Sequence, residues 1–311
     1  MSADNNFITI LGHTAGGKTS VAANLAYKIN GEIISADSRQ IYRKMDIGTG
    51  KDLSDYTINN KKISYHLIDI KDAGYKYNVY EYQTDFLKIY NKLKNKNITP
   101  ILCGGTGLYI EAILKGYKLI NVPENNNLRK ELSQKTHKEL IKILLQYKQQ
   151  HNKSHIDTKK RTIRAIEIAD YYSKNKNINT NFPKINSLII GINFDRVTRR
   201  KRITERLISR INEGMINEVK QLINNGINPE DLIYYGLEYK FITKYIIGEL
   251  SYDKMISQLK TAIHQFAKRQ MTWFRRMERN GFKINWINGE LPMNKKIEEI
   301  LFLLKNHLQK H

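Results

Sequence analysis

Cysteine, long apolar runs and acidic residues are all scarce in this chain of 311 residues. The single cysteine, Cys103, cannot form a disulfide within the chain, which suits a reducing compartment. No apolar stretch approaches the ~20 residues that a membrane-spanning helix needs, and no basic leader precedes an apolar segment at the start. We therefore expect a cytoplasmic protein that is monomeric and has no membrane partner.

Basic residues far outnumber acidic ones, because 52 Lys and Arg against 30 Asp and Glu give a formal net charge of +22. The excess is densest between residues 116 and 185, which hold 15 basic and 6 acidic residues. Such an excess attracts polyanions, of which nucleic acid is the usual partner. Solvated lysines in a chain rich in Lys, Asn and Ile would produce part of the same excess, so charge alone leaves both interpretations open.

Apolar runs alternate with helical periodicity in the first 115 residues, which is the rhythm of a parallel sheet covered by helices. Strands are predicted at 7–11, 31–36, 65–70 and 98–103, and helices at 18–29, 78–95 and 106–115. Strand signals stop from about 120 to 180 and return at 187–195 and 282–287. The other late segments have helical periodicity, at 197–226, 237–248, 251–279 and 293–309. We predict an α/β core with C-terminal helices, formed by 1–117 and 185–311, and a helical insertion at 118–184.

The stretch GHTAGGKT, residues 12–19, fits the pattern G-x-x-x-x-G-K-[ST] between a predicted strand and a predicted helix. Backbone N–H groups and the lysine of such a loop surround a phosphate chain, and the hydroxyl of its last residue binds Mg²⁺. This predicts a P-loop NTPase-like core with Thr19 as the metal ligand. The predicted phosphate-binding residues are Gly12, Thr14, Ala15, Gly16, Gly17, Lys18 and Thr19.

Two polar segments follow the next predicted strands. Asp37, after EIISA, faces the phosphate site, where its carboxylate suits a general base; capping a turn is the alternative for this residue. Thr106, after ILCGG, offers a hydroxyl and the N-terminus of a helix to the same cleft. An ordinary connection between a strand and a helix would have a similar sequence. Asp69, which ends YHLID, suits a strand end better than a catalyst. The sequence therefore does not show the full set of groups that an ATPase uses, which includes an acid for Mg²⁺ and a polar group that holds the attacking water.

Three helical segments carry clustered basic residues. In the insertion, Arg161 and Arg164 share one helix face, with Ile163 and Ile166 towards the core. Arg199, Arg202, Arg206 and Arg210 share one helix face, which is either a solvated face or a phosphate-binding one. Lys268 and Arg269 alternate with Phe266, Trp273 and Phe274, a mixture that suits single-stranded nucleic acid, although buried packing explains the aromatic residues equally well.

Taken together, these stretches are similar to the tRNA dimethylallyltransferase family. The matching segments, in the family's order, are 12–19, 34–52, 65–70, 104–109, 159–168, 202–219 and 267–276, and they span most of the chain. The resemblance implies transfer of a dimethylallyl group from dimethylallyl diphosphate to the exocyclic N6 amine of the adenosine 3′-adjacent to the anticodon. It also implies that the helical insertion grips the anticodon stem-loop of tRNA.

The resemblance assigns roles to individual residues. Asp37 resembles the general base, Arg202 the arginine that binds the diphosphate, and Lys18 and Thr19 the residues that hold the diphosphate with Mg²⁺. Predicted tRNA contacts are Asp37, Ser38, Arg39, Gln40, Thr106, Lys160, Arg161, Thr162, Ile163 and Arg164, joined by Lys268 and Arg269.

Some positions depart from the family pattern. His13 and Gly16 replace the usual Pro and Ser of the phosphate loop, and His264 stands where an arginine is usual.

Three further functions stay open. An enzyme that prenylates free AMP or ADP would need neither the basic insertion nor the Arg-rich aromatic helix. A P-loop nucleoside kinase would use the same phosphate loop with ATP, and a non-enzymatic RNA-binding protein would use the basic helices alone.

Overall fold

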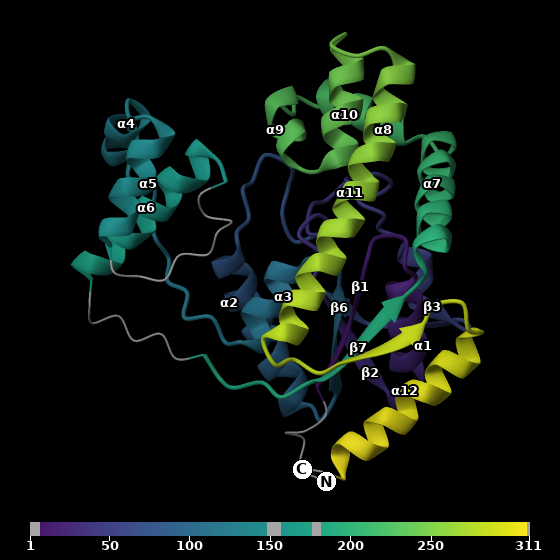
Figure 1. The fold of residues 1–311 in the computed structure, drawn as a ribbon. Helices are drawn as coiled ribbons and strands as arrows, with labels where there is room; N and C mark the ends of the chain where they lie inside the picture. The colour runs from purple at the N-terminus through teal and green to yellow at the C-terminus, as the bar shows by residue number, and fades with distance from the viewer. Residues whose placement is uncertain (1–6, 148–156, 176–181, 310–311) are drawn as a thin grey trace. The chain divides into compact units, whose positions relative to one another are not determined.

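The computed structural model describes residues 7–147, 157–175 and 182–309. Two compact units make up the chain (Figure 1). The first unit joins Met1–Tyr117 to Lys184–His311, and the second is Lys118–Pro183. No helix in the described ranges is both long and apolar enough to cross a membrane.

A sheet of six strands forms the centre of the first unit, with the order β5-β2-β6-β1-β7-β8 and every neighbouring pair parallel. Its strands are β1 (Ile8–Gly12), β2 (Gly31–Ser35), β5 (Tyr65–His66), β6 (Thr99–Gly104), β7 (Leu188–Asn193) and β8 (Ile284–Asn288). Two short strands, β3 (Thr57–Ile58) and β4 (Lys61–Lys62), form a separate antiparallel pair. The central strand β1 is buried along its whole length because helices cover both faces.

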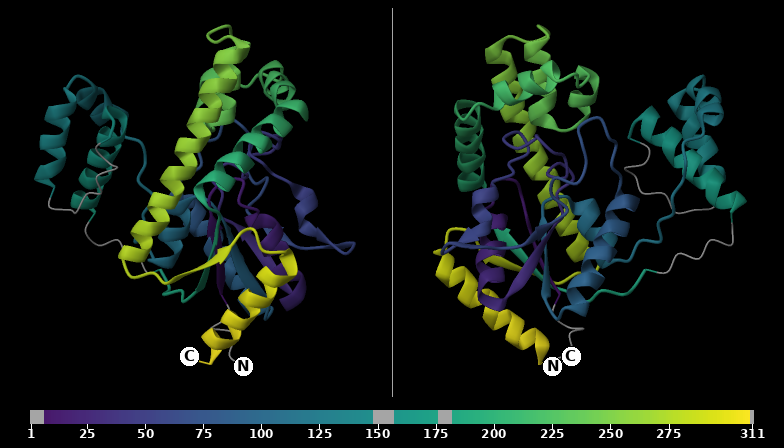
Figure 2. Two further views of the ribbon diagram at one scale, coloured as in Figure 1. Left: turned by 45° about the vertical axis from the view of Figure 1, so that its right-hand side comes forward. Right: turned by 180° about the vertical axis from the view of Figure 1, so that it is seen from behind.

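Helices cover the two faces of the sheet (Figures 1 and 2). On one face lie α1 (Lys18–Ile29) and α12 (Met293–Leu308), and on the other α2 (Val79–Asn95), α3 (Gly107–Leu114) and α11 (Tyr252–Arg279). Ile10 and Cys103 pack towards α1, whereas Tyr82 of α2 stacks on Tyr109 of α3 with ring centroids 4.0 Å apart. The predicted P-loop NTPase-like fold is confirmed, with a parallel sheet between two helical layers.

The chain after β7 forms a helical layer beyond the carboxyl ends of the strands (Figure 1). It consists of α7 (Arg196–Asn212), α8 (Met215–Asn224), α9 (Pro229–Tyr234), α10 (Leu237–Ile246) and the start of α11. The single helix predicted at 197–226 is wrong, since Gly214 adopts a left-handed φ of 102° and separates α7 from α8. The strand predicted at 65–70 ends at His66, because Leu67 and Asp69 have φ values of 60° and 55°.

The second unit is a small helical body made of α4 (Asn126–Ser133), α5 (His137–Gln146) and α6 (Lys159–Lys174). Leucines of α4 and α5, Leu132 and Leu140, pack against Ile166 of α6. The carboxylate of Glu167 is buried there and accepts hydrogen bonds from Arg129 (2.8 Å) and the Asn125 backbone N–H (2.5 Å). Burial alone would raise the pKa of Glu167, but these bonds outweigh it and lower the pKa.

Candidate functional site

Three loops that follow β1, β2 and β6 meet at the carboxyl edge of the sheet, as parallel pairing requires. The backbone N–H of Thr106 donates to the Ala36 carbonyl (3.2 Å), and the Ser38 N–H donates to the Thr106 hydroxyl (3.1 Å). Thr106 therefore ties the loop after β6 to the loop after β2. The structure brings Thr106, Asp37 and the phosphate loop (residues 12–19) to one site, as the sequence indicated.

The phosphate loop curls tightly between β1 and α1. Ala15 and Gly17 take left-handed φ values of 59° and 68°, and Lys18 begins α1. The Lys18 ammonium donates to the His13 carbonyl oxygen at 2.7 Å. Burial lowers the pKa of Lys18 to about 8, although the nearby Cys103 and Asp37 oppose this effect. A phosphate group in the loop would therefore meet a partly buried cation.

Gln270 of α11 holds the phosphate loop to the loop after β6, a role that no sequence pattern had indicated. Its side-chain oxygen accepts from the Thr14 backbone N–H at 2.8 Å, and its side-chain nitrogen donates to the Gly105 carbonyl at 2.9 Å. Gln270 is 7% exposed. The sequence did contain a signal for this role. Gln270 lies between Ala267 and Phe274 on the buried side of an amphipathic helix, where a polar amide needs hydrogen-bond partners.

His13 and Gly16, two of the departures from the family pattern, are structurally linked. The His13 ring is fully buried and its Nδ1 lies 2.7 Å from the Thr14 carbonyl oxygen, so Nδ1–H donates there. Burial lowers the pKa of His13 to about 4, and the positive charge of Lys18 adds to this shift. A Cβ at Gly16 would lie 2.9 Å from the His13 oxygen and 3.5 Å from its ring, so the glycine leaves room for this histidine.

Arginines of α7 reach the site, which favours the phosphate-binding interpretation of that helix face. The Nε of Arg202 donates to the Ala15 carbonyl at 3.1 Å, and its guanidinium lies over the Phe194 ring, 4.6 Å from the centroid. Arg206 donates to the Gly50 carbonyl, and Arg210 pairs with Asp52. Arg202 is therefore the α7 arginine that contacts the phosphate loop itself.

Asp37 follows β2 and is partly exposed at the site. Its Oδ1 accepts from the Arg39 backbone N–H at 2.9 Å, so the turn-capping interpretation holds for one carboxylate oxygen. Gln40 donates to the Gly50 carbonyl at 3.1 Å, and the Arg39 guanidinium lies over the Tyr234 ring, 5.5 Å from the centroid. The general-base role of Asp37 stays a prediction.

The predicted tRNA-contacting segment of α6 divides into surface and interior residues. Lys160 and Arg161 are exposed, and Ile163 packs against the small core. Thr162 is fully buried, and its hydroxyl donates to the Thr158 carbonyl. The buried side chain offers no surface of its own to an RNA, and a tRNA contact at Thr162 stays a prediction. Arg164 forms an ion pair with the buried Glu167, so its positive charge is partly neutralised within the second unit.

Lys268 and Arg269 lie on the exposed side of α11. The Arg269 guanidinium lies over the Phe266 ring, 5.9 Å from its centroid, and Phe266 is 37% exposed. In contrast, Phe274 is fully buried, and Arg276 covers the Trp273 ring at 4.0 Å. Of the three aromatic residues predicted near these cations, Phe266 therefore offers the surface suited to base stacking.

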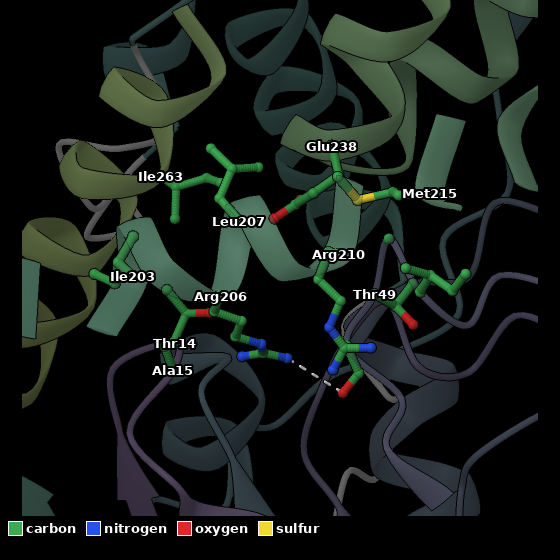
Figure 3. A pocket seen from close by; sticks show the side chains of 13 residues that line it. Thr14, Ala15, Thr49, Ile203, Arg206, Leu207, Arg210, Met215, Glu238 and Ile263 are labelled. Atoms are coloured by element: carbon green, nitrogen blue, oxygen red, sulfur yellow. Dashed lines mark hydrogen bonds between the residues drawn. The ribbon is translucent and has the colours of Figure 1, made fainter. Parts of the chain in front are cut away.

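A small pocket borders the phosphate loop (Figure 3). Its cavity volume is about 50 Å³. It is lined by Thr14 and Ala15 of the phosphate loop and by residues 47–50. Its other lining residues come from α7, α8, α10 and α11 and are Ile203, Arg206, Leu207, Arg210, Met215, Glu238 and Ile263. Burial raises the pKa of Glu238.

Comparisons with known proteins point to one family. A family model described as IPP transferase matches residues 40–277. The chain is 60% identical to tRNA dimethylallyltransferase 2 of Bacteroides fragilis over 302 residues, which cover 97% of this chain and 99% of that protein. It is also 60% identical over 301 residues to tRNA dimethylallyltransferase 1 of Parabacteroides distasonis, covering 97% and 98% of the two chains. The full-length tRNA isopentenylpyrophosphate transferase of Bacillus halodurans matches with a TM-score of 0.71 and 30% identity, covering 99% of this chain and 100% of that chain.

Gln270→Leu should destabilise the protein, because a leucine of similar size leaves the Thr14 N–H and the Gly105 carbonyl without their partner. We expect the free energy of unfolding to fall by about 2 kcal/mol, the cost of an unsatisfied buried group. Denaturant unfolding measures this change. Gln265→Leu, on the exposed side of the same helix, is the matched control and should stay within about 0.5 kcal/mol of the wild type. Equal stability of the two variants would show that the Gln270 bridge contributes nothing.

The lowered pKa of Lys18 predicts a pH-dependent contribution to stability. The pKa is about 8 in the folded protein and 10.5 in a model peptide, so the unfolded chain binds more protons between these values. Stability contributed by Lys18 therefore rises as pH increases from 8 to 10.5.

Lys18→Met removes this titration. The difference in unfolding free energy between Lys18→Met and the wild type, measured from pH 7 to pH 11, cancels the contributions of other groups. Relative to the wild type, the variant should be most stable below pH 8, and this advantage in unfolding free energy should shrink above pH 8. A difference in unfolding free energy that is constant over this pH range would rule out the lowered pKa of Lys18.

Proposed function

The chain belongs to the IPP transferase family, and from this premise we propose that it is a tRNA dimethylallyltransferase. The reaction moves a dimethylallyl group from dimethylallyl diphosphate to the N6 amine of the adenosine 3′-adjacent to the anticodon. The observation that carries this proposal is the meeting of the phosphate loop, Arg202 and Asp37 at one edge of the sheet. Such a site offers cations for a departing diphosphate and a carboxylate for an attacking amine.

The phosphate loop and Arg202 would bind the diphosphate. As the bond between the allylic carbon and the diphosphate oxygen breaks, negative charge accumulates on the departing group. Lys18, the loop N–H groups and the Arg202 guanidinium stabilise that charge. Residues 12 and 14–19 therefore act on a leaving group, whereas a kinase would use the same loop to transfer phosphate.

Magnesium is a proposed cofactor at the same loop. The described residues contain no group of three or more His, Cys, Asp or Glu side chains arranged to hold a metal. Mg²⁺ usually takes one or two protein ligands and completes its shell with phosphate oxygens and water, so the Thr19 hydroxyl beside a diphosphate fits it. When bound, it would supply positive charge to the diphosphate oxygens.

Asp37 is the proposed general base. The N6 amine of adenine is a poor nucleophile because its lone pair is delocalised into the ring. A carboxylate that takes its proton as the new C–N bond forms lowers this barrier. The hydrogen bond from the Arg39 N–H to Oδ1 fixes the carboxylate orientation, which supports this role.

The basic surfaces would bind the anticodon stem-loop. Lys160 and Arg161 of the second unit, and Lys268 and Arg269 of α11, are exposed cations suited to phosphate contacts. Arg39, Ser38 and Gln40 flank the proposed base and would contact the target nucleotide. The target base must leave its stack to reach the site, at a cost of a few kcal/mol that is lowest in a loop. A cytoplasmic monomer remains our prediction.

The assay that tests this function offers the protein Mg²⁺, dimethylallyl diphosphate and either unmodified tRNA or free AMP. We expect a five-carbon group to appear on the tRNA adenosine and none on AMP, measured by mass spectrometry of nuclease digests. Transfer to AMP alone would favour an adenylate prenyltransferase. Phosphorylation of a nucleoside by ATP, without prenyl transfer, would favour the kinase.

Asp37→Asn should reduce kcat by about 10²- to 10⁴-fold, the range of general base catalysis, because the amide cannot take a proton. The asparagine keeps an oxygen for the Arg39 N–H, so tRNA affinity should change little. Single-turnover transfer and tRNA binding by filter retention measure the two effects. Asp72→Asn, which removes an exposed carboxylate paired with Arg43, is the control. Near-normal turnover in Asp37→Asn would exclude the base assignment.

A further inference from the structure

The carbonyl oxygens of three consecutive residues in the phosphate loop all accept a hydrogen bond. The Lys18 ammonium donates to the His13 oxygen at 2.7 Å, and the Arg202 guanidinium donates to the Ala15 oxygen at 3.1 Å. Between them, the His13 ring donates through Nδ1–H to the Thr14 oxygen at 2.7 Å. A carbonyl oxygen carries partial negative charge and would repel a diphosphate oxygen. Lys18 and Arg202 also serve the proposed diphosphate, whereas the His13 ring acts on the loop itself.

The bond from the His13 ring sets the direction of the next peptide group. In a trans peptide the C=O of one residue and the N–H of the next point in opposite directions, and the part of the chain that the structure describes has no cis peptide bond. Because the Thr14 carbonyl is held at the His13 ring, the N–H of Ala15 points away from that ring. Ala15 also has a left-handed φ of 59°, which is unfavourable for an alanine and persists only where the surroundings hold it.

Both peptide groups that flank Thr14 are held by buried side chains. Gln270 accepts from the Thr14 N–H at 2.8 Å and holds the peptide group between residues 13 and 14, and His13 holds the one between residues 14 and 15. A Cβ at Gly16 would lie 2.9 Å from the His13 carbonyl oxygen, so a side chain there would displace the first of these peptide groups. The glycine at residue 16 therefore belongs to the same arrangement as the histidine at residue 13.

Packing alone does not explain a histidine at residue 13. Its ring meets Phe194 edge to face with centroids 5.8 Å apart, a contact that a phenylalanine would make equally well. Nε2 has no hydrogen-bond partner among the described residues, and an unpaired buried nitrogen is unfavourable. Burial lowers the pKa of His13 to about 4, so the ring is neutral near pH 7 and its one proton lies on Nδ1, which faces the Thr14 oxygen. The Nδ1 bond is therefore what the histidine adds to an apolar ring.

We infer that His13 is a positioning residue for the diphosphate of the donor, because its Nδ1–H holds the Thr14 carbonyl so that the Ala15 N–H faces the phosphate site. This bond takes over the rigidity that the usual proline would give to the loop. His13 acts through the backbone of residues 14 and 15 and does not touch the reacting atoms. The inference rests on the proposed diphosphate donor, and inorganic diphosphate is enough to test it.

Two substitutions separate the hydrogen bond from the packing of the ring. His13→Phe keeps an aromatic ring against Phe194 but has no donor. His13→Asn loses the ring but keeps a donor in place, because its amide nitrogen, like Nδ1, is bonded to Cγ. Binding of inorganic diphosphate with Mg²⁺ is measured by calorimetry. We expect diphosphate to bind about tenfold more weakly to His13→Phe, and to bind His13→Asn within about threefold of the wild type.

Stability, measured by denaturant unfolding, should follow the opposite order, because His13→Asn leaves unfilled space beside Phe194 and His13→Phe fills it. This reversed ranking distinguishes a positioning residue from a packing residue. In the transfer assay, KM for dimethylallyl diphosphate should rise about tenfold in His13→Phe, while KM for tRNA stays within about twofold of the wild type. His66→Phe, at a histidine of β5 that pairs with Glu32, is the matched control and should bind diphosphate as the wild type does.

Diphosphate binding to His13→Phe at the wild-type level, or weaker binding to His13→Asn than to His13→Phe, would overturn the inference. If His13→Phe fails to fold, His13→Gln replaces it in the comparison, since its amide nitrogen lies one carbon further from the backbone and corresponds to Nε2. His13→Gln should then bind diphosphate more weakly than His13→Asn, and the reverse order would also overturn the inference. The expected ranking without transfer to any tRNA would instead contradict the proposed function and leave the role of His13 standing.

Discussion

The position of β1 between β6 and β7 is the constraint on which the site depends. Because these strands run parallel, their carboxyl ends reach one edge of the sheet, and the loops that follow them are brought together. The phosphate loop continues from β1, Thr106 follows β6, and Asp37 follows the neighbouring β2. No single loop holds the chemistry, so the register of the sheet sets the distances between its parts.

The helical layer beyond the strands converts these loops into a rigid site. Gln270 joins the phosphate loop to the loop after β6, Arg202 contacts the phosphate loop, and Glu218 holds the loop after residue 45. Each tie runs from a helix to the backbone of a loop. The helices therefore supply the supporting contacts that a binding site needs to stay in one geometry.

The sequence was informative where the signal is local. The phosphate loop, its flanking strand and helix, and Asp37 after the second strand follow from residue patterns a few positions long. Gln270 and Glu218 were missed because each contacts a backbone segment more than 150 residues away, and a backbone partner leaves no side-chain pattern to detect. The break at Gly214 interrupts a continuous apolar period, and Thr162 is buried although its neighbours are basic. At Gly214 the left-handed backbone overrides the apolar period, and at Thr162 packing overrides the local pattern.

The order of the strands along the chain also governs how the protein forms during synthesis. The first 104 residues supply β1, β2, β5 and β6, which pair with one another, whereas β7 begins at Leu188. Until then β1 is an apolar strand with one bare edge, the kind of edge that invites pairing with other chains. The intervening unit has a core of its own and emerges from the ribosome first. Closure of the sheet around β1 is thus a late, long-range step, and crowding of nascent chains at that stage is the hazard that this topology carries.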